Sequence, residues 1–126
     1  MAEIKISDLS VGDWIAYNGK KYRIKEISSP YASVTLWGNN EQRDESIVLI
    51  EPIPLTPEIL EKNGFSHNGN KWYTPELFTL ERWSKGWTII IACSCGDYVC
   101  EVCTIKYVHQ LQHALRLAGV EKEIEL

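Results

Sequence analysis

The chain has 126 residues, a length that fits one domain or at most two very small modules sharing a core, and not a large enzyme. Hydrophobic residues make up 44% and charged residues 24% of the chain, proportions typical of a globular protein and not of a disordered or fibrous one. The formal net charge of −4 removes the usual electrostatic argument for non-specific binding to nucleic acid. Because the chain has no apolar run of about 20 residues and its opening residues lack the apolar stretch of a signal peptide, we expect a cytoplasmic protein.

A β-hairpin is predicted close to the N-terminus. Residues 14–17 and 20–27 are rich in strand formers, and Asn18-Gly19 between them is the strongest short-range hairpin signal. A two-residue turn at this point places Ile15 opposite Tyr22. Because side chains alternate between the two faces of a strand, the buried face is expected to consist of Ile15, Tyr17, Tyr22 and Ile24.

Two further short strands are expected in the first part of the chain. Residues 31–37 alternate apolar with polar or exposed side chains, which is typical of a half-buried strand. Residues 38–44 are polar and predict a loop, and residues 46–50 predict a short buried strand that ends at Pro52. Residues 1–52 therefore predict an N-terminal subdomain, a small antiparallel barrel or bent sheet that resembles a Src-homology-3-like barrel.

Residues 53–126 predict a second subdomain, which begins with a short helix. Thr56-Pro57-Glu58 favours a helix start, because the hydroxyl can cap the helix, proline at the first position loses no needed donor, and glutamate favours the positive helix end. Gly64 is expected to end this helix. Asn68-Gly69 then predicts a hairpin in which Phe65 lies opposite Trp72.

The remaining residues predict an antiparallel meander and one packed helix. Residues 78–83 favour a strand, and residues 87–95 and 98–106 form a well-defined hairpin joined across Gly96-Asp97. From residue 107 to residue 118 the apolar side chains recur at helical spacing. The two subdomains together predict an α+β fold that forms one compact unit.

Four cysteines are the densest group of metal-ligating side chains: Cys93, Cys95, Cys100 and Cys103. Four thiolates can satisfy tetrahedral zinc. In the predicted hairpin, however, Cys93 faces Cys100 while Cys103 points to the opposite face, so one zinc ion would not reach all four. The favoured interpretation is free thiols that pack as small hydrophobes, with zinc and a Cys93–Cys100 disulfide as alternatives, the disulfide being disfavoured in a reducing compartment.

A pair of histidines forms the second candidate metal site. His109 and His113 lie four residues apart on the predicted final helix, as in the zinc-protease pattern HExxH. Gln110 stands where that pattern has glutamate, and an amide cannot act as a general base. Because the apolar stripe lies on the other side of the helix, we interpret the pair as facing solvent or an interface.

Aromatic side chains provide the candidate partner-binding residues, which are Trp14, Arg23, Trp72, Trp83 and Trp87. In the first hairpin Trp14 lies opposite Arg23, where a guanidinium over the indole would stabilise by about 0.5–1 kcal/mol. Trp72, Trp83 and Trp87, with Tyr73, form either an exposed stacking platform or part of the core, as is commoner for aromatics in strands. The basic stripe of Lys20, Lys21, Arg23 and Lys25 is interpreted as a solvated face, and it is the one place suited to a phosphate backbone.

Three stretches of the chain resemble a family of small uncharacterised proteins found in Bacteroides-type bacteria and their prophages. These stretches are Leu9-Ser10-Val11-Gly12-Asp13-Trp14, residues 51–65 from Glu51-Pro52-Ile53-Pro54 to Phe65, and residues 107–115 from Tyr107-Val108-His109 to Leu115. The resemblance implies a compact α+β protein from a mobile element. It implies no activity and no functional residue, and the cysteine cluster is not part of the matching pattern.

The sequence therefore predicts a non-enzymatic interaction module. It contains no G-x-S-x-G elbow and no glycine-rich phosphate loop, so neither an enzyme nor a cofactor is expected. We expect the partner to be another protein or a second copy of the chain, and not nucleic acid or a membrane. The alternatives are a zinc protein that uses the cysteines or the histidine pair, and a weak nucleic-acid binder that uses the first hairpin.

Overall fold

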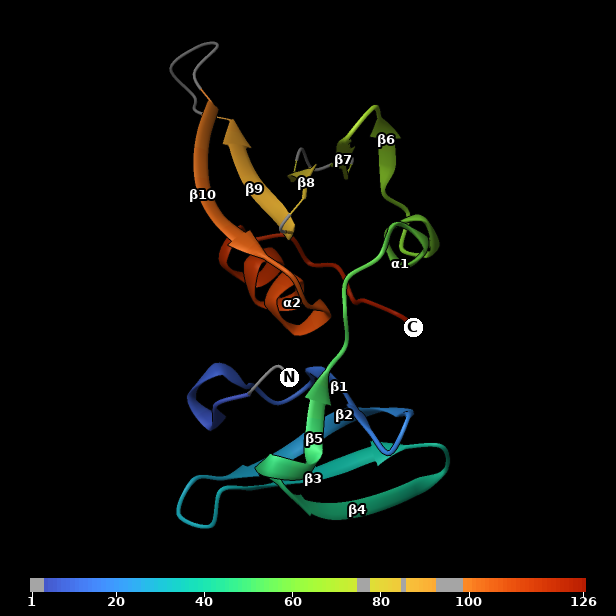
Figure 1. The fold of residues 1–126 in the computed structure, drawn as a ribbon, viewed down its shortest axis with the longest axis vertical. Helices are drawn as coiled ribbons and strands as arrows, with labels where there is room; N and C mark the ends of the chain where they lie inside the picture. The colour runs from blue at the N-terminus through green and yellow to red at the C-terminus, as the bar shows by residue number, and fades with distance from the viewer. Residues whose placement is uncertain (1–3, 75–77, 85, 93–98) are drawn as a thin grey trace. The chain divides into compact units, whose positions relative to one another are not determined.

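The computed structural model describes residues 4–74, 78–84, 86–92 and 99–126, with the backbone alone at 90–92 and 99–103. The chain forms two compact units, whose elements are labelled in Figure 1. Unit 1 comprises Met1–Pro54 with Tyr107–His109, and unit 2 comprises Leu55–Lys106 with Gln110–Leu126. Among the described residues, no helix has both the length and the apolar character needed to cross a bilayer.

Unit 1 is built on an antiparallel sheet with the strand order β4-β3-β2-β1-β5. The last strand, β5, thus pairs with the first strand, β1, and forms one edge of the sheet. Its elements are η1 (Ile6–Asp8), β1 (Trp14–Tyr17), β2 (Lys20–Ser28), β3 (Ser33–Gly38), β4 (Glu41–Ser46), η2 (Ile47–Leu49) and β5 (Ile50–Pro52). This small bent sheet confirms the fold predicted for the N-terminal part of the chain.

The first hairpin of unit 1 forms in the predicted register. Asn18 and Gly19 both have positive φ, 51° and 77°, which is the turn geometry that matches the twist of a two-residue hairpin. Ile15 lies opposite Tyr22, and one face of the sheet is buried. The buried cluster of unit 1 consists of Leu9, Ile15, Tyr22, Ile24, Val34, Leu36 and Ile50.

The region between residues 38 and 50 differs from the prediction. The expected loop at 38–44 is largely strand β4, which pairs with β3 after a turn at Asn39 and Asn40. The expected strand at 46–50 is largely the 3-10 helix η2. The strand was missed because β4 consists of charged and polar residues, as is common for a strand at a sheet edge, and its charged sequence imitates a loop.

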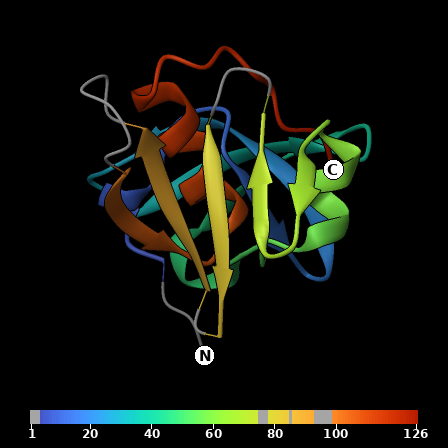
Figure 2. The same cartoon turned by 90° about the horizontal axis from the view of Figure 1, so that it is seen from above.

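Unit 2 contains a meander of strands in sequence order, β10-β9-β8-β7-β6. Figure 2 shows this sheet from one side, with α2 behind it. The elements are α1 (Pro57–Lys62), β6 (Ser66–Asn68), β7 (Lys71–Tyr73), β8 (Thr79–Trp83), β9 (Gly86–Ala92), β10 (Val99–Ile105) and α2 (Val108–Leu117), of which the first two residues belong to unit 1. With the sheet of unit 1, this meander and its helices confirm the α+β fold class.

Local capping determines where α1 begins and how the C-terminal tail is held. The Thr56 hydroxyl accepts a hydrogen bond from the Ile59 amide at 3.3 Å, as predicted for the start of this helix. At its other end, the buried Asn63 side chain donates to the Glu125 carbonyl at 2.8 Å and accepts from the Glu125 amide at 2.7 Å. These two bonds join the end of α1 to the tail of the same unit.

The second hairpin has a different register from the one predicted. His67, and not Phe65, lies opposite Trp72, and the two rings stack with their centroids 4.4 Å apart. Asn68 pairs with Lys71, so the turn residues are Gly69 and Asn70. Gly69 supplies a positive φ of 65° at the first turn position. A two-residue turn of type II′ requires glycine at this position.

Candidate functional site

A tight turn at Ser10–Asp13 forms one wall of the candidate site. The Asp13 side chain is fully buried, and its Oδ2 accepts a hydrogen bond from the Ser10 amide at 2.8 Å. Gly12 has a φ of +95°, a conformation that L side chains rarely adopt. The Gly12 amide donates to the Ile24 carbonyl at 2.8 Å, and the Ile24 amide donates to the Asp13 carbonyl at 2.9 Å. The turn is therefore held against β2.

A row of four side chains crosses the face of the sheet opposite the unit 1 core, which we call the outer face. Trp14, Arg23, Trp37 and Gln42 are successive cross-strand partners in β1, β2, β3 and β4. Directly opposed residues lie on the same face of a sheet. Arg23 therefore lies between two tryptophans in this row.

Two contacts orient Arg23 within this row. Its Nε donates to the Gly12 carbonyl at 3.2 Å, and its guanidinium carbon lies 5.3 Å from the centre of the Trp14 ring. The second contact confirms the cation–π pair predicted from the hairpin register. Arg23 thus connects the 10–13 turn to the middle of the outer face.

A β-bulge places a second cation beside this row. Ile24 pairs with Leu36 and Glu26 pairs with Thr35, so Lys25 is an extra residue with no direct cross-strand partner. Bulges redirect the side chain that they carry. The Lys25 ammonium donates to Gln42 Oε1 at 2.9 Å, which brings it to the end of the row.

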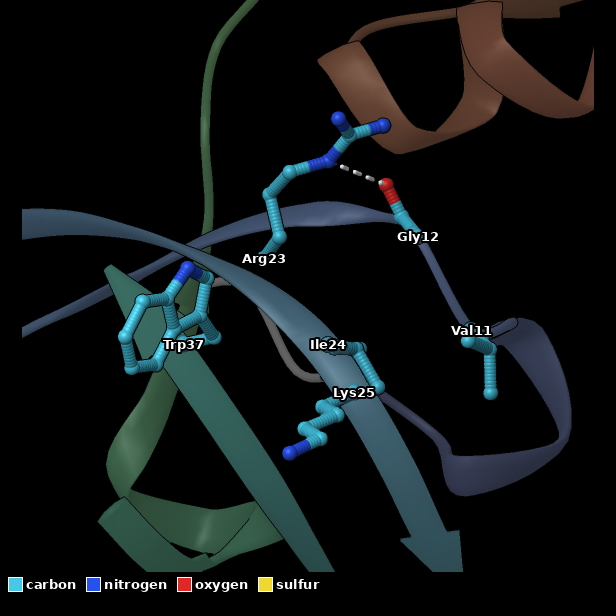
Figure 3. Close-up of a pocket in the computed structure, with 6 residues that line it drawn as sticks. All are labelled: Val11, Gly12, Arg23, Ile24, Lys25 and Trp37. Atoms are coloured by element: carbon cyan, nitrogen blue, oxygen red, sulfur yellow. Dashed lines mark hydrogen bonds between the residues drawn. The ribbon is translucent and has the colours of Figure 1, made fainter. Parts of the chain in front are cut away.

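An open pocket of about 450 Å³ lies between the 10–13 turn and this row, and its volume is in the size range of ligand sites. We call it the Trp37 pocket. Figure 3 shows Arg23 extending to the Gly12 carbonyl, with Lys25 and Trp37 projecting from β2 and β3. Trp37 itself is 52% exposed. The described lining consists of Val11, Gly12, Arg23, Ile24, Lys25 and Trp37, and it includes no carboxylate.

A polar network lies at the β4 edge of the sheet of unit 1, on the face that carries the core. The Tyr22 hydroxyl donates to Glu41 Oε1, and this hydrogen bond, assisted by burial, raises the pKa of Tyr22. The guanidinium carbon of Arg43 lies 5.1 Å from the centre of the Tyr17 ring. The Arg43 Nε donates to Glu45 Oε1 at 3.0 Å, and this hydrogen bond raises the pKa of Arg43.

A second pocket of about 430 Å³ is lined by Tyr17, Asn18, Gly19, Leu49 and Glu51. It combines one carboxylate with polar turn residues, and no cation is found among the lining residues that the structure describes. The Trp37 pocket is the better candidate site, because it combines an exposed indole with cationic groups.

The predicted aromatic platform of unit 2 is exposed only at Tyr73 and Trp83. Trp72 and Trp87 are 5% and 4% exposed and contact each other edge to face, with ring centroids 6.2 Å apart. The Trp87 indole donates to the Leu55 carbonyl at 3.3 Å. Only Trp83 of the three is exposed, at 56%. Core packing, the commoner role for aromatics in strands, describes Trp72 and Trp87.

The predicted cysteine geometry is only partly open to comparison. Cys93 and Cys95 lie outside the described residues, and the backbone alone is described at Cys100 and Cys103. Cys100 lies opposite Ile91, and not opposite Cys93 as predicted. The predicted two-residue turn at Gly96-Asp97 lies outside the described residues. A register shift between Glu101 and Thr104 also interrupts the alternation on which the placement of Cys103 relied.

The histidine pair is placed differently from the prediction. His109 is 4% exposed, whereas His113 is half-buried. The buried arc of α2 is wider than the apolar stripe, because it also includes Gln112. Within the part of the chain that the structure describes, no three His, Cys, Asp or Glu side chains gather in a group that could hold a metal ion.

Sequence reasoning missed the pocket although it identified parts of it. Trp14, Arg23 and the basic stripe were recognised, but Val11, Gly12 and Trp37 were not associated with them. The available signal was the alternation of residues 33–37. It places Trp37 on one face of the strand and Val34 and Leu36 on the other. The contribution of the 10–13 turn depends on its hydrogen bonds to Ile24, which no short-range pattern indicates.

Comparison of the chain with protein-family models, with curated proteins and with solved structures finds no match.

Proposed function

We propose that the protein is a non-enzymatic protein-binding module of mobile-element origin, and that its ligand occupies the Trp37 pocket. The observation that carries this proposal is the half-exposed indole of Trp37 at an apolar pocket with firmly held walls. Tryptophan and arginine are the residues that most often dominate the binding energy of protein interfaces. A wall that is held in place before binding lowers the entropic cost of association.

The chemistry of the pocket supports binding without catalysis. The described lining offers two cations, one indole and aliphatic surface. It contains no serine, cysteine or histidine that would act as a nucleophile, and no carboxylate or imidazole that would act as a general base near pH 7. Such a site can hold a ligand in a defined orientation.

Selection of peptides from a random linear library on the full chain tests the proposal. The Trp37→Ala variant is expected to bind the selected peptides about 10- to 30-fold more weakly, as for a central interface tryptophan. Trp83→Ala is the matched control, because Trp83 is exposed to the same degree but belongs to unit 2. Equal losses in the two variants, or no selected peptide at all, would contradict the proposal.

A further inference from the structure

We infer that the ligand of the Trp37 pocket is an acidic peptide segment, in which an apolar side chain packs beside Trp37 and an adjacent carboxylate pairs with Lys25 and Arg23. This inference rests on the proposed function and adds the chemistry of the partner. The juxtaposition that carries it is an indole with two cations at one pocket whose described lining residues include no carboxylate.

The charge of Lys25 is suited to a carboxylate ligand. The Lys25 side chain is exposed, and its ammonium donates to the amide oxygen of Gln42. Gln42 is neutral, so this bond orients the ammonium without compensating its charge. A carboxylate at the pocket would form a charge-assisted hydrogen bond, which is about twice as strong as a neutral one.

Arg23 provides the second cation at a defined position. Its Nε is bonded to the Gly12 carbonyl and its guanidinium lies over the Trp14 ring. The guanidinium therefore enters complex formation with its orientation already determined, and less side-chain entropy is lost than for a mobile arginine. The apolar part of the ligand is served by Val11 and Trp37, which are 60% and 52% exposed.

The distribution of charge on the outer face favours a short acidic segment over a nucleic-acid strand. Lys21, two residues from Arg23 on β2, extends the positive surface in one direction. In the other direction the next row is Glu26, Thr35 and Asp44, and Asp44 accepts a hydrogen bond from Thr35 at 2.7 Å. A phosphate backbone needs a continuous positive groove, whereas a peptide with one or two carboxylates can avoid the acidic row.

The test is titration of the full-length protein with three synthetic peptides that share one central leucine. The leucine is flanked on both sides by glutamate, by glutamine or by lysine. We expect the glutamate peptide to bind about tenfold more tightly than the glutamine peptide, with affinity that falls as salt is raised, and the lysine peptide to bind most weakly. A single-stranded oligonucleotide is titrated in parallel.

Charge variants of one lysine show whether the preference arises at this pocket. Lys25→Gln is expected to weaken binding of the glutamate peptide about fivefold, and Lys25→Glu is expected to reverse the order of the glutamate and lysine peptides. Lys25→Arg should retain the preference. Lys20→Gln is the matched control, because Lys20 is equally an exposed lysine of β2 but pairs with Tyr17, away from the pocket.

The outcomes separate the two proposals. If the glutamate and glutamine peptides bind equally and Trp37→Ala abolishes both, the acidic-ligand inference is wrong and the protein-binding function stands. If none of the peptides binds while the random library still yields Trp37-dependent ligands, the inference again fails alone. If only the oligonucleotide binds, and Lys25→Gln weakens it, both proposals are overturned in favour of nucleic-acid recognition.

Discussion

Arg23 lies directly opposite Trp37 across strands β2 and β3, and its guanidinium is held over the ring of Trp14 on the other side. Two tryptophans therefore lie on either side of Arg23 in the row across the outer face of unit 1. The arrangement depends on a neighbouring turn, because the Arg23 Nε donates to the Gly12 carbonyl. This turn is held by Asp13, whose Oδ2 accepts a hydrogen bond from the Ser10 amide.

Replacement of Asp13 with alanine should destabilise the protein and weaken ligand binding together. The substitution removes the buried oxygen that accepts from the Ser10 amide, and such a loss costs about 1–3 kcal/mol. Chemical denaturation measures the free energy of unfolding. Asp8→Ala, at an exposed carboxylate, is the control and should change it by less than about 0.5 kcal/mol. Equal stability of the two variants would contradict the role assigned to Asp13.

Stability at alkaline pH should depend on Tyr22. The hydrogen bond to Glu41 raises the pKa of Tyr22 above its ordinary value of 10.0, so the folded state retains the phenolic proton at pH values where the unfolded state releases it. This contribution is fully present below pH 10 and is lost as the pH rises through the raised pKa.

Denaturation as a function of pH measures this effect. Tyr22→Phe should show a smaller loss of stability above pH 10 than the unsubstituted protein, although it is less stable at neutral pH because the hydrogen bond is missing. Tyr31→Phe, at a tyrosine that is 82% exposed, should leave the alkaline profile unchanged. Identical profiles for Tyr22→Phe and the unsubstituted protein would show that Tyr22 makes no such contribution.

Replacement of Asn63 with alanine should release the C-terminal tail of unit 2. The substitution removes both hydrogen bonds between the Asn63 side chain and the backbone of Glu125, at a cost of about 1–3 kcal/mol. Amide hydrogen exchange at Glu125 should become faster, while exchange in β8 changes less. Asn68→Ala, at an exposed asparagine of the same unit, is the control. Unchanged protection at Glu125 would contradict this account of the tail.

The fold was predictable where short-range signals decide the structure. Asn18-Gly19 specified the first turn and hence the register of Ile15 with Tyr22, and Thr56 specified the start of α1. Strand β4 was not predictable in this way, because its charged residues resemble those of a loop. The register of the second hairpin was predicted wrongly because its turn was placed one residue too early. Either Asn68-Gly69 or Gly69-Asn70 can form a two-residue connection.

The candidate site was predictable only in part. The pairing of Trp14 with Arg23 followed from the hairpin, and Lys25 was recognised as basic. The pocket also requires the bulge at Lys25 and the docking of the 10–13 turn on Ile24. Both features arise from hydrogen bonds between segments that are separated in sequence, and periodicity within one segment does not encode them.

The most direct test of the binding site is to follow the tryptophan indole resonances by nuclear magnetic resonance while the glutamate-flanked leucine peptide is added to the full-length protein. The Trp37 indole N–H should shift progressively and saturate with the peptide, while the indole N–H of Trp83 remains in place. A saturating shift at Trp83 with none at Trp37 would contradict the assignment of the ligand to the Trp37 pocket.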